Sequence, residues 1–65
     1  MWMKRYKTPH HNWRECDEEY VTGQLLGRFN DVDATLRTMR ENPGKVISTP
    51  MIEFKWVDAK DENHP

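Results

Sequence analysis

The clearest pattern of apolar and polar positions lies at residues 30–44, NDVDATLRTMRENPG. Val32, Leu36 and Met39 recur at the i, i+4, i+7 spacing of one helix face, and mostly polar residues occupy the positions between them. An Asn-Asp pair before this stripe offers an N-cap oxygen, and the Pro-Gly pair after it is typical of a helix end. We therefore predict a helix over about 31–42, which is too short to be stable without packing on another element.

The following segment, residues 45–57 (KVISTPMIEFKWV), predicts a strand. Ile52, Phe54 and Trp56 alternate with charged residues, which is the period of a half-buried strand. Pro50 cannot donate to a sheet ladder, so it marks an edge, a bulge or a break between two short strands. We expect Phe54 and Trp56 to pack against the apolar stripe of the helix.

Residues 18–29 (EEYVTGQLLGRF) fit two interpretations. Val21 and Leu25 share a face whether the segment is a strand or a helix. Gly23 and Gly27 would each cost about 1 kcal/mol inside a helix. We therefore favour a strand and keep the helix as the alternative.

The start of the chain, residues 1–7, also predicts a strand, followed by a loop or short helical turn over 8–18. Strand alternation would place these residues on two faces: Trp2, Lys4 and Tyr6 on one, Met3, Arg5 and Lys7 on the other. Residues 58–65 are polar and predict a frayed tail. The expected fold is a small α+β domain over residues 1–57, in which one helix packs on a small antiparallel sheet in the order β-β-α-β(β).

Composition makes this domain marginal. A chain of 65 residues buries only about 60% of its unfolded surface, and 35% hydrophobic residues is a low share. Cys16 is the only cysteine, so an intrachain disulfide is excluded. Aromatic packing and association with a larger protein or a second copy remain as sources of stability.

Targeting signals are not expected. The first 20 residues hold no apolar run of four, so no signal peptide is predicted, and no segment is long and apolar enough to cross a membrane. With a single thiol, the expected compartment is the cytoplasm.

Metal and catalytic chemistry are also not expected. His10, His11, Cys16 and His64 have the types of zinc ligands but not the close-spaced pairs of a structural site. The carboxylates around Cys16 should raise its pKa, which argues against a reactive thiolate. No P-loop or other catalytic motif is present, and 65 residues rarely enclose a substrate, so we predict neither enzymatic activity nor a cofactor.

Charge is unevenly distributed, although the net charge is −1. The first 14 residues hold no acid and four cations, Lys4, Arg5, Lys7 and Arg14. Cations interleaved with Trp and Tyr suit phosphate contacts and base stacking, so weak nucleic-acid binding is one hypothesis. The slightly negative net charge of the chain argues against this hypothesis. The acids at 15–19 can also pair with the basic residues at the start of the chain.

The favoured hypothesis is a protein-protein interaction module that regulates a larger protein. Chains this short without a catalytic motif are often inhibitors, adaptors or assembly factors, many of them from phages and bacteria. Trp, Tyr, Met and Arg are enriched at interface centres. The predicted contact residues are three aromatic anchors and a charged rim: Trp2, Tyr6 and Trp13, then Glu15, Asp17, Glu18 and Glu19.

Overall fold

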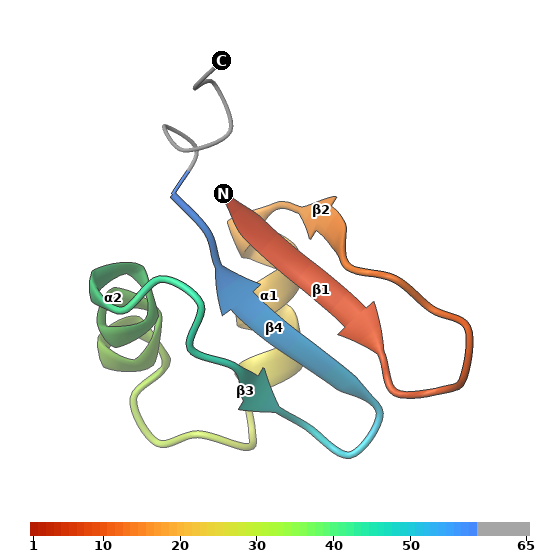
Figure 1. Cartoon of the computed structure of the whole chain (residues 1–65). Coiled ribbons are helices and arrows are strands. Elements are labelled where there is room, and N and C mark those ends of the chain that lie inside the picture. Colours follow the sequence, from red (N-terminus) through yellow and green to blue (C-terminus); the bar gives the residue numbers. More distant parts are fainter. Residues whose placement is uncertain (59–65) are drawn as a thin grey trace.

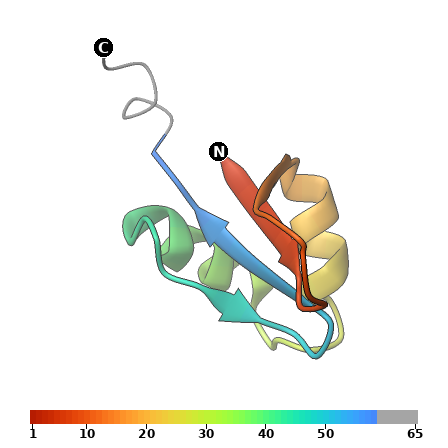
Figure 2. The same cartoon turned by 45° about the vertical axis from the view of Figure 1, so that its right-hand side comes forward.

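A computed structural model describes residues 1–58, in which two helices accompany a four-stranded antiparallel sheet. The elements are β1 (Trp2–Tyr6), β2 (Arg14–Cys16), α1 (Glu18–Leu25), α2 (Val32–Glu41), β3 (Ile47–Ser48) and β4 (Ile52–Trp56). The strand order is β2-β1-β4-β3, so the first and last strands form the central pair. Figure 1 looks onto the face of the sheet opposite α1, and Figure 2 turns the same arrangement by 45°. The α+β class is confirmed, and the predicted tail lies largely outside the described residues.

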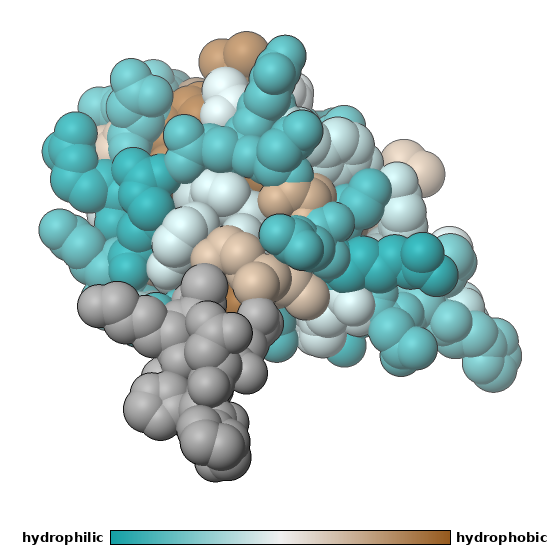
Figure 3. Space-filling view, turned by 90° about the horizontal axis from the view of Figure 1, so that it is seen from above, coloured by the Kyte–Doolittle hydropathy of each residue, from teal (hydrophilic) through white to brown (hydrophobic). Residues whose placement is uncertain are grey.

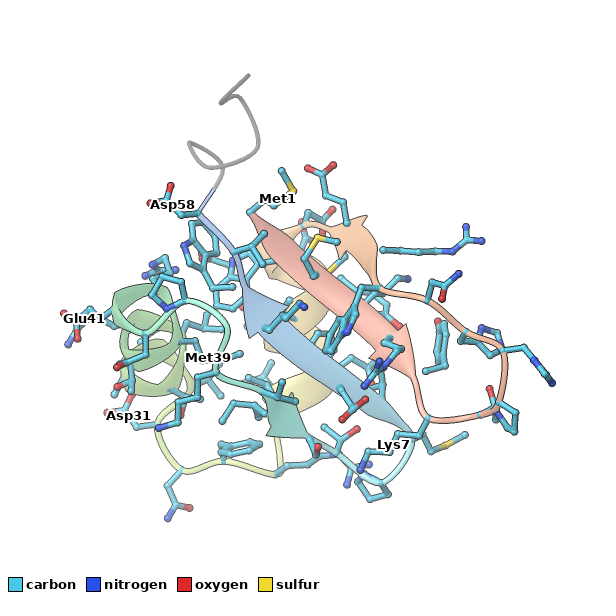
Figure 4. The ribbon with its side chains drawn as sticks, in the orientation of Figure 1. Met1, Lys7, Asp31, Met39, Glu41 and Asp58 are labelled. Carbon is cyan, nitrogen blue, oxygen red and sulfur yellow. The ribbon has the colours of Figure 1, made fainter. Side chains whose placement is uncertain are left out.

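Helix α2 agrees with the predicted helix over about 31–42. The Asp31 side chain accepts a hydrogen bond from the Ala34 amide at 3.0 Å and so caps the first turn. The three residues of the apolar stripe, Val32, Leu36 and Met39, are all buried. Figure 4 shows Met39 on α2 near the lower half of the sheet.

The preference for a strand over 18–29 was wrong, because this segment forms α1. Asp17 is the N-cap, and its carboxylate accepts from the Tyr20 amide at 2.8 Å. Gly27 lies after the helix at φ 85°, a left-handed position that favours glycine, so it carries none of the expected penalty. Gly23 is the only glycine inside the helix, and burial of Val21 and Leu25 outweighs its cost.

Two further strands are short. The loop expected over 8–18 contains β2, which pairs with β1, so that part of the prediction was incomplete. Of the three alternatives at Pro50, an edge, a bulge or a break, the structure has the break, which lies between β3 and β4. There the buried Thr49 hydroxyl donates to the Ile52 carbonyl at 3.0 Å and accepts from the Ile52 amide at 3.2 Å.

The core lies between the helices and one face of the sheet. Among residues 1–58, eight apolar residues are buried in it: Trp2, Val21, Leu25, Val32, Leu36, Met39, Ile52 and Phe54. Trp56 is only partly buried against this cluster, and its ring meets the Trp2 ring edge-on at 5.0 Å. The expected packing of the last strand against α2 is therefore confirmed for Phe54 and partial for Trp56. Seen from above, much of the surface outside this core is hydrophilic (Figure 3).

Candidate functional site

Within residues 1–58, no helix covers the face of the sheet turned away from the core (Figure 1), and we call it the open face. The strand register places Met3 opposite both Glu15 and Lys55, and Glu53 opposite both Arg5 and Ser48. Directly opposed residues in antiparallel strands point to the same face. The open face therefore comprises these residues and Trp13, whose ring contacts two of them: Met3, Arg5, Trp13, Glu15, Ser48, Glu53 and Lys55.

Trp13 lies near the middle of these contacts. The Arg5 guanidinium carbon is 4.6 Å from the centroid of its ring, and the Lys55 Nζ is 4.3 Å from it. Each cation is attracted to the ring by about 0.5–1 kcal/mol where water has access. The indole is thus held against the sheet in a half-buried position, with a cation from each central strand beside it.

Arg5 is further fixed by a cross-strand ion pair. Its Nε and Nη2 donate to Glu53 Oε1 at 3.0 and 2.8 Å. The Glu53 side chain is 19% exposed and that of Arg5 is 39% exposed, so the pair is partly shielded from water. Lys55 has no such partner among the described residues, and its positive charge remains available to a binding molecule.

The acids predicted as one rim have separate roles. Glu15 lies on the open face, while Asp17 caps α1. Glu18 accepts from the Trp2 indole Nε1 at 3.1 Å and also pairs with Arg40 of α2. Glu19 is exposed. Of these four acids, only Glu15 therefore shares a surface with Trp13. In the ion pairs observed, none of the four pairs with a cation of residues 1–14.

The other two predicted anchors lie elsewhere. Trp2 is 4% exposed and belongs to the core, as strand alternation allowed. Tyr6 is 41% exposed at the far end of β1, on the same side of the strand as Trp2. Of the three aromatic residues, only Trp13 lies on the open face.

The four cations of the nucleic-acid hypothesis are divided. Lys4 and Arg14 oppose each other on the side of the sheet that faces the helices, and Arg5 points to the open face. Lys7 follows β1, where its amide donates to the Met51 carbonyl at 3.0 Å, and Figure 4 shows it at the end of the sheet opposite Met1. They do not form one basic surface.

Titrating groups lie near the end of β1. The Tyr6 and Tyr20 hydroxyl oxygens are 3.2 Å apart. The hydrogen bond from Tyr20 and the nearby Lys4 ammonium lower the pKa of Tyr6. The same hydrogen bond, assisted by burial, raises the pKa of Tyr20 to about 12.

Cys16 is half-buried, and burial is the main cause that raises the pKa of its thiol. Lys4 opposes this effect, and Asp17 and Glu15 add to it, so the predicted direction is right although burial outweighs the carboxylates. Within residues 1–58, no three metal-binding side chains converge, and His64 lies outside that range. No helix in the described part of the chain is long and apolar enough to cross a membrane.

Comparison with known proteins leaves the function open. The chain matches no protein family model, and no curated protein sequence or solved structure shows significant similarity to it.

Sequence reasoning missed the partners of Trp13. Alternation along residues 52–56 did separate Glu53 and Lys55 from the apolar positions. The pairing of β1 with β4, which brings these two residues beside Arg5 and Trp13, depends on contacts about 50 residues apart and has no local signal.

Proposed function

We propose that this protein is a non-enzymatic interaction module that uses the open face to bind and regulate a larger protein. The observation that supports this most directly is Trp13, a half-buried indole on an uncovered sheet face with Arg5 and Lys55 beside it. Trp and Arg are the residue types most enriched among energetically dominant interface contacts. The neighbouring Met3 adds an apolar, adaptable side chain to the same face.

The surroundings of Trp13 define what the partner should present. An apolar side chain would extend the contact of Met3 and Trp13, and a carboxylate beside it would meet the unpaired charge of Lys55. Arg5, already held by Glu53, would act as a pre-positioned donor at little cost in side-chain entropy.

Binding should depend on Trp13 and not on apolar exposure in general. We expect Trp13→Ala to weaken capture of a partner by about 30-fold or more, the effect of losing a dominant interface residue. Leu26→Ala is the matched control, because Leu26 is 62% exposed and follows α1, away from the open face. Quantitative pull-downs from the native host, with folding checked by circular dichroism, compare the two variants with the wild type. Equal capture by all three would contradict the proposal.

The same variants test association with a second copy. If the open face binds this chain itself, sedimentation equilibrium will detect a dimer that Trp13→Ala dissociates and Leu26→Ala leaves intact. If a dimer forms and no other protein is captured, the partner of the open face is a second copy of this chain and not a larger protein.

Nucleic-acid binding is the less favoured function. The four cations are divided between the faces of the sheet, and cations already contact the indole that would stack on a base. Fluorescence anisotropy with single- and double-stranded DNA and RNA at about 50 mM salt tests it where electrostatic attraction is strong. Salt-sensitive binding there would favour this alternative.

A further inference from the structure

A separate hollow of about 260 Å³ lies where the end of β1, the β1–β2 loop and the start of β2 meet. Its lining residues are Lys4, Tyr6, His11, Asn12 and Arg14. Lys4 and Arg14 carry positive charge, and the other three side chains can donate hydrogen bonds. None of these lining residues is a carboxylate. Such a lining suits an anion.

The placement of the two cations strengthens this inference. Lys4 and Arg14 lie directly opposite each other in the β1–β2 register. Like charges at opposed positions destabilise a sheet. Among residues 1–58 neither cation forms an ion pair with an acid. An anion between them would replace this repulsion by two attractions.

Lys4 is also held at the wall of the hollow. Its Nζ is 4.3 Å from the centroid of the Tyr20 ring and 5.4 Å from that of the Tyr6 ring. These contacts orient the ammonium group without neutralising it.

The loop from β1 to β2 supplies the remaining donors. His10 has φ 72°, a left-handed conformation that costs a non-glycine residue about 1–2 kcal/mol. Immediately after it, the His11 ring packs edge-on against Tyr6, with centroids 5.6 Å apart. His11 and Asn12 both line the hollow, so this turn of the backbone completes it.

We propose that this hollow binds a phosphate-sized oxyanion, such as the terminal group of a phosphate or sulfate ester. It is smaller than typical pockets for whole small-molecule ligands, so the group would enter and the rest of the ester would remain outside. An adjoining hollow of about 450 Å³ includes Glu53, whose negative charge makes it less suited to an anion. The proposal goes beyond the open face and does not depend on Trp13.

Titration with inorganic phosphate at low ionic strength, followed by amide NMR shifts, tests the proposal. We expect saturable shifts centred on Asn12 and Arg14. Arg14→Gln should weaken binding at least tenfold, because it removes a charge-assisted hydrogen-bond donor. Arg37→Gln removes an exposed cation of α2 and should leave binding unchanged. Arg14 is itself exposed, so its replacement should preserve the fold.

Three outcomes would overturn the proposal: no saturable shift, equal weakening by both variants, or shifts centred on Lys7 and Thr8 of the adjoining hollow. Titrations with phosphoserine, a nucleoside monophosphate and sulfate then distinguish which source of the oxyanion binds best. The two proposals can fail separately. If phosphate does not bind, the protein interaction through Trp13 is unaffected, because Arg14→Gln retains Trp13. If Trp13→Ala does not weaken capture of a partner, the oxyanion site is unaffected.

Discussion

Glu18 connects three elements, and its removal should destabilise the fold more than removal of its neighbour Glu19. The Glu18 carboxylate accepts from the Trp2 indole of β1 and pairs with Arg40 of α2. Both glutamates lie in the first turn of α1, but no hydrogen bond or ion pair is seen for Glu19 within residues 1–58. Glu19→Ala is therefore a matched control for Glu18→Ala.

The expected difference follows from the contacts. Each substitution loses an interaction with the helix dipole of about 0.3–1 kcal/mol, which cancels in the comparison. Glu18→Ala also removes the carboxylate that accepts from the Trp2 indole N–H, a charge-assisted hydrogen bond that contributes about 1–3 kcal/mol. The Arg40 pair is worth little, because its side chains are 39% and 52% exposed. Glu18→Ala should therefore be less stable than Glu19→Ala by about 1–3 kcal/mol. Each kcal/mol of this difference lowers the Tm by about 4–8 °C in a domain of this size.

Thermal unfolding followed by far-ultraviolet circular dichroism measures this difference. Glu18→Gln retains a carbonyl oxygen for the indole and should recover most of the loss, which separates the hydrogen bond from the charge. If Glu18→Ala and Glu19→Ala melt within about 2 °C of each other, the hydrogen bond to Trp2 contributes nothing measurable and the reasoning is refuted.

Three further predictions concern single contacts. Absorbance titration should show two tyrosine steps, Tyr6 below its ordinary pKa of 10.0 and Tyr20 at about 12; Tyr20→Phe should move the first step upward. The pKa of Tyr20 is 10.0 in the unfolded chain and about 12 in the folded protein. Its contribution to stability is therefore present below pH 10 and is lost as the pH rises toward 12. Thr49→Val should cost about 1–3 kcal/mol in urea unfolding, since it leaves the Ile52 amide without the hydroxyl acceptor. Cys16 should be alkylated more slowly in the folded protein than in urea, because burial raises its pKa.

Each of these has a clear contrary result. A single tyrosine step would show that the two hydroxyls do not interact, and an unchanged first step in Tyr20→Phe would mean the same. An unchanged unfolding midpoint for Thr49→Val would show that the turn does not need its hydroxyl. Equal alkylation rates in the folded and unfolded protein would remove burial as the cause at Cys16.

The elements that were predicted correctly carry their signals locally. The spacing of Val32, Leu36 and Met39 places one helix face without reference to the rest of the chain. The sequence disfavours α1 only if both Gly23 and Gly27 lie inside the helix, whereas Gly27 is in the turn that follows it. The stronger signal was Asp17 with two acids after it, a typical helix start.

The candidate site was predictable only in part. Alternation correctly separated Trp2 and Lys4 from Met3 and Arg5, which assigns each side chain to a face. It could not reveal that Arg5 and Lys55 meet at Trp13, because sheet pairing is decided by the packing of the whole core. For the same reason, the sequence does not predict that Lys4 and Arg14 lie opposite each other, because it predicts a loop where β2 forms.

The central position of the first and last strands also affects when the protein can fold. Residues 2–6 pair with residues 52–56, and the Val57 amide donates to the Met1 carbonyl at 3.0 Å. During synthesis, β1 therefore has only β2 as a neighbour until β4 has left the ribosome, and β3 has no strand to join. The helices α1 and α2 are synthesised before β4, but the core that they would form on this hairpin lacks Ile52 and Phe54 until β4 arrives. The hairpin alone is at best marginally stable in water. The chain consequently waits for its last strand, and a nascent chain stalled before β4 should remain a substrate for proteases and chaperones.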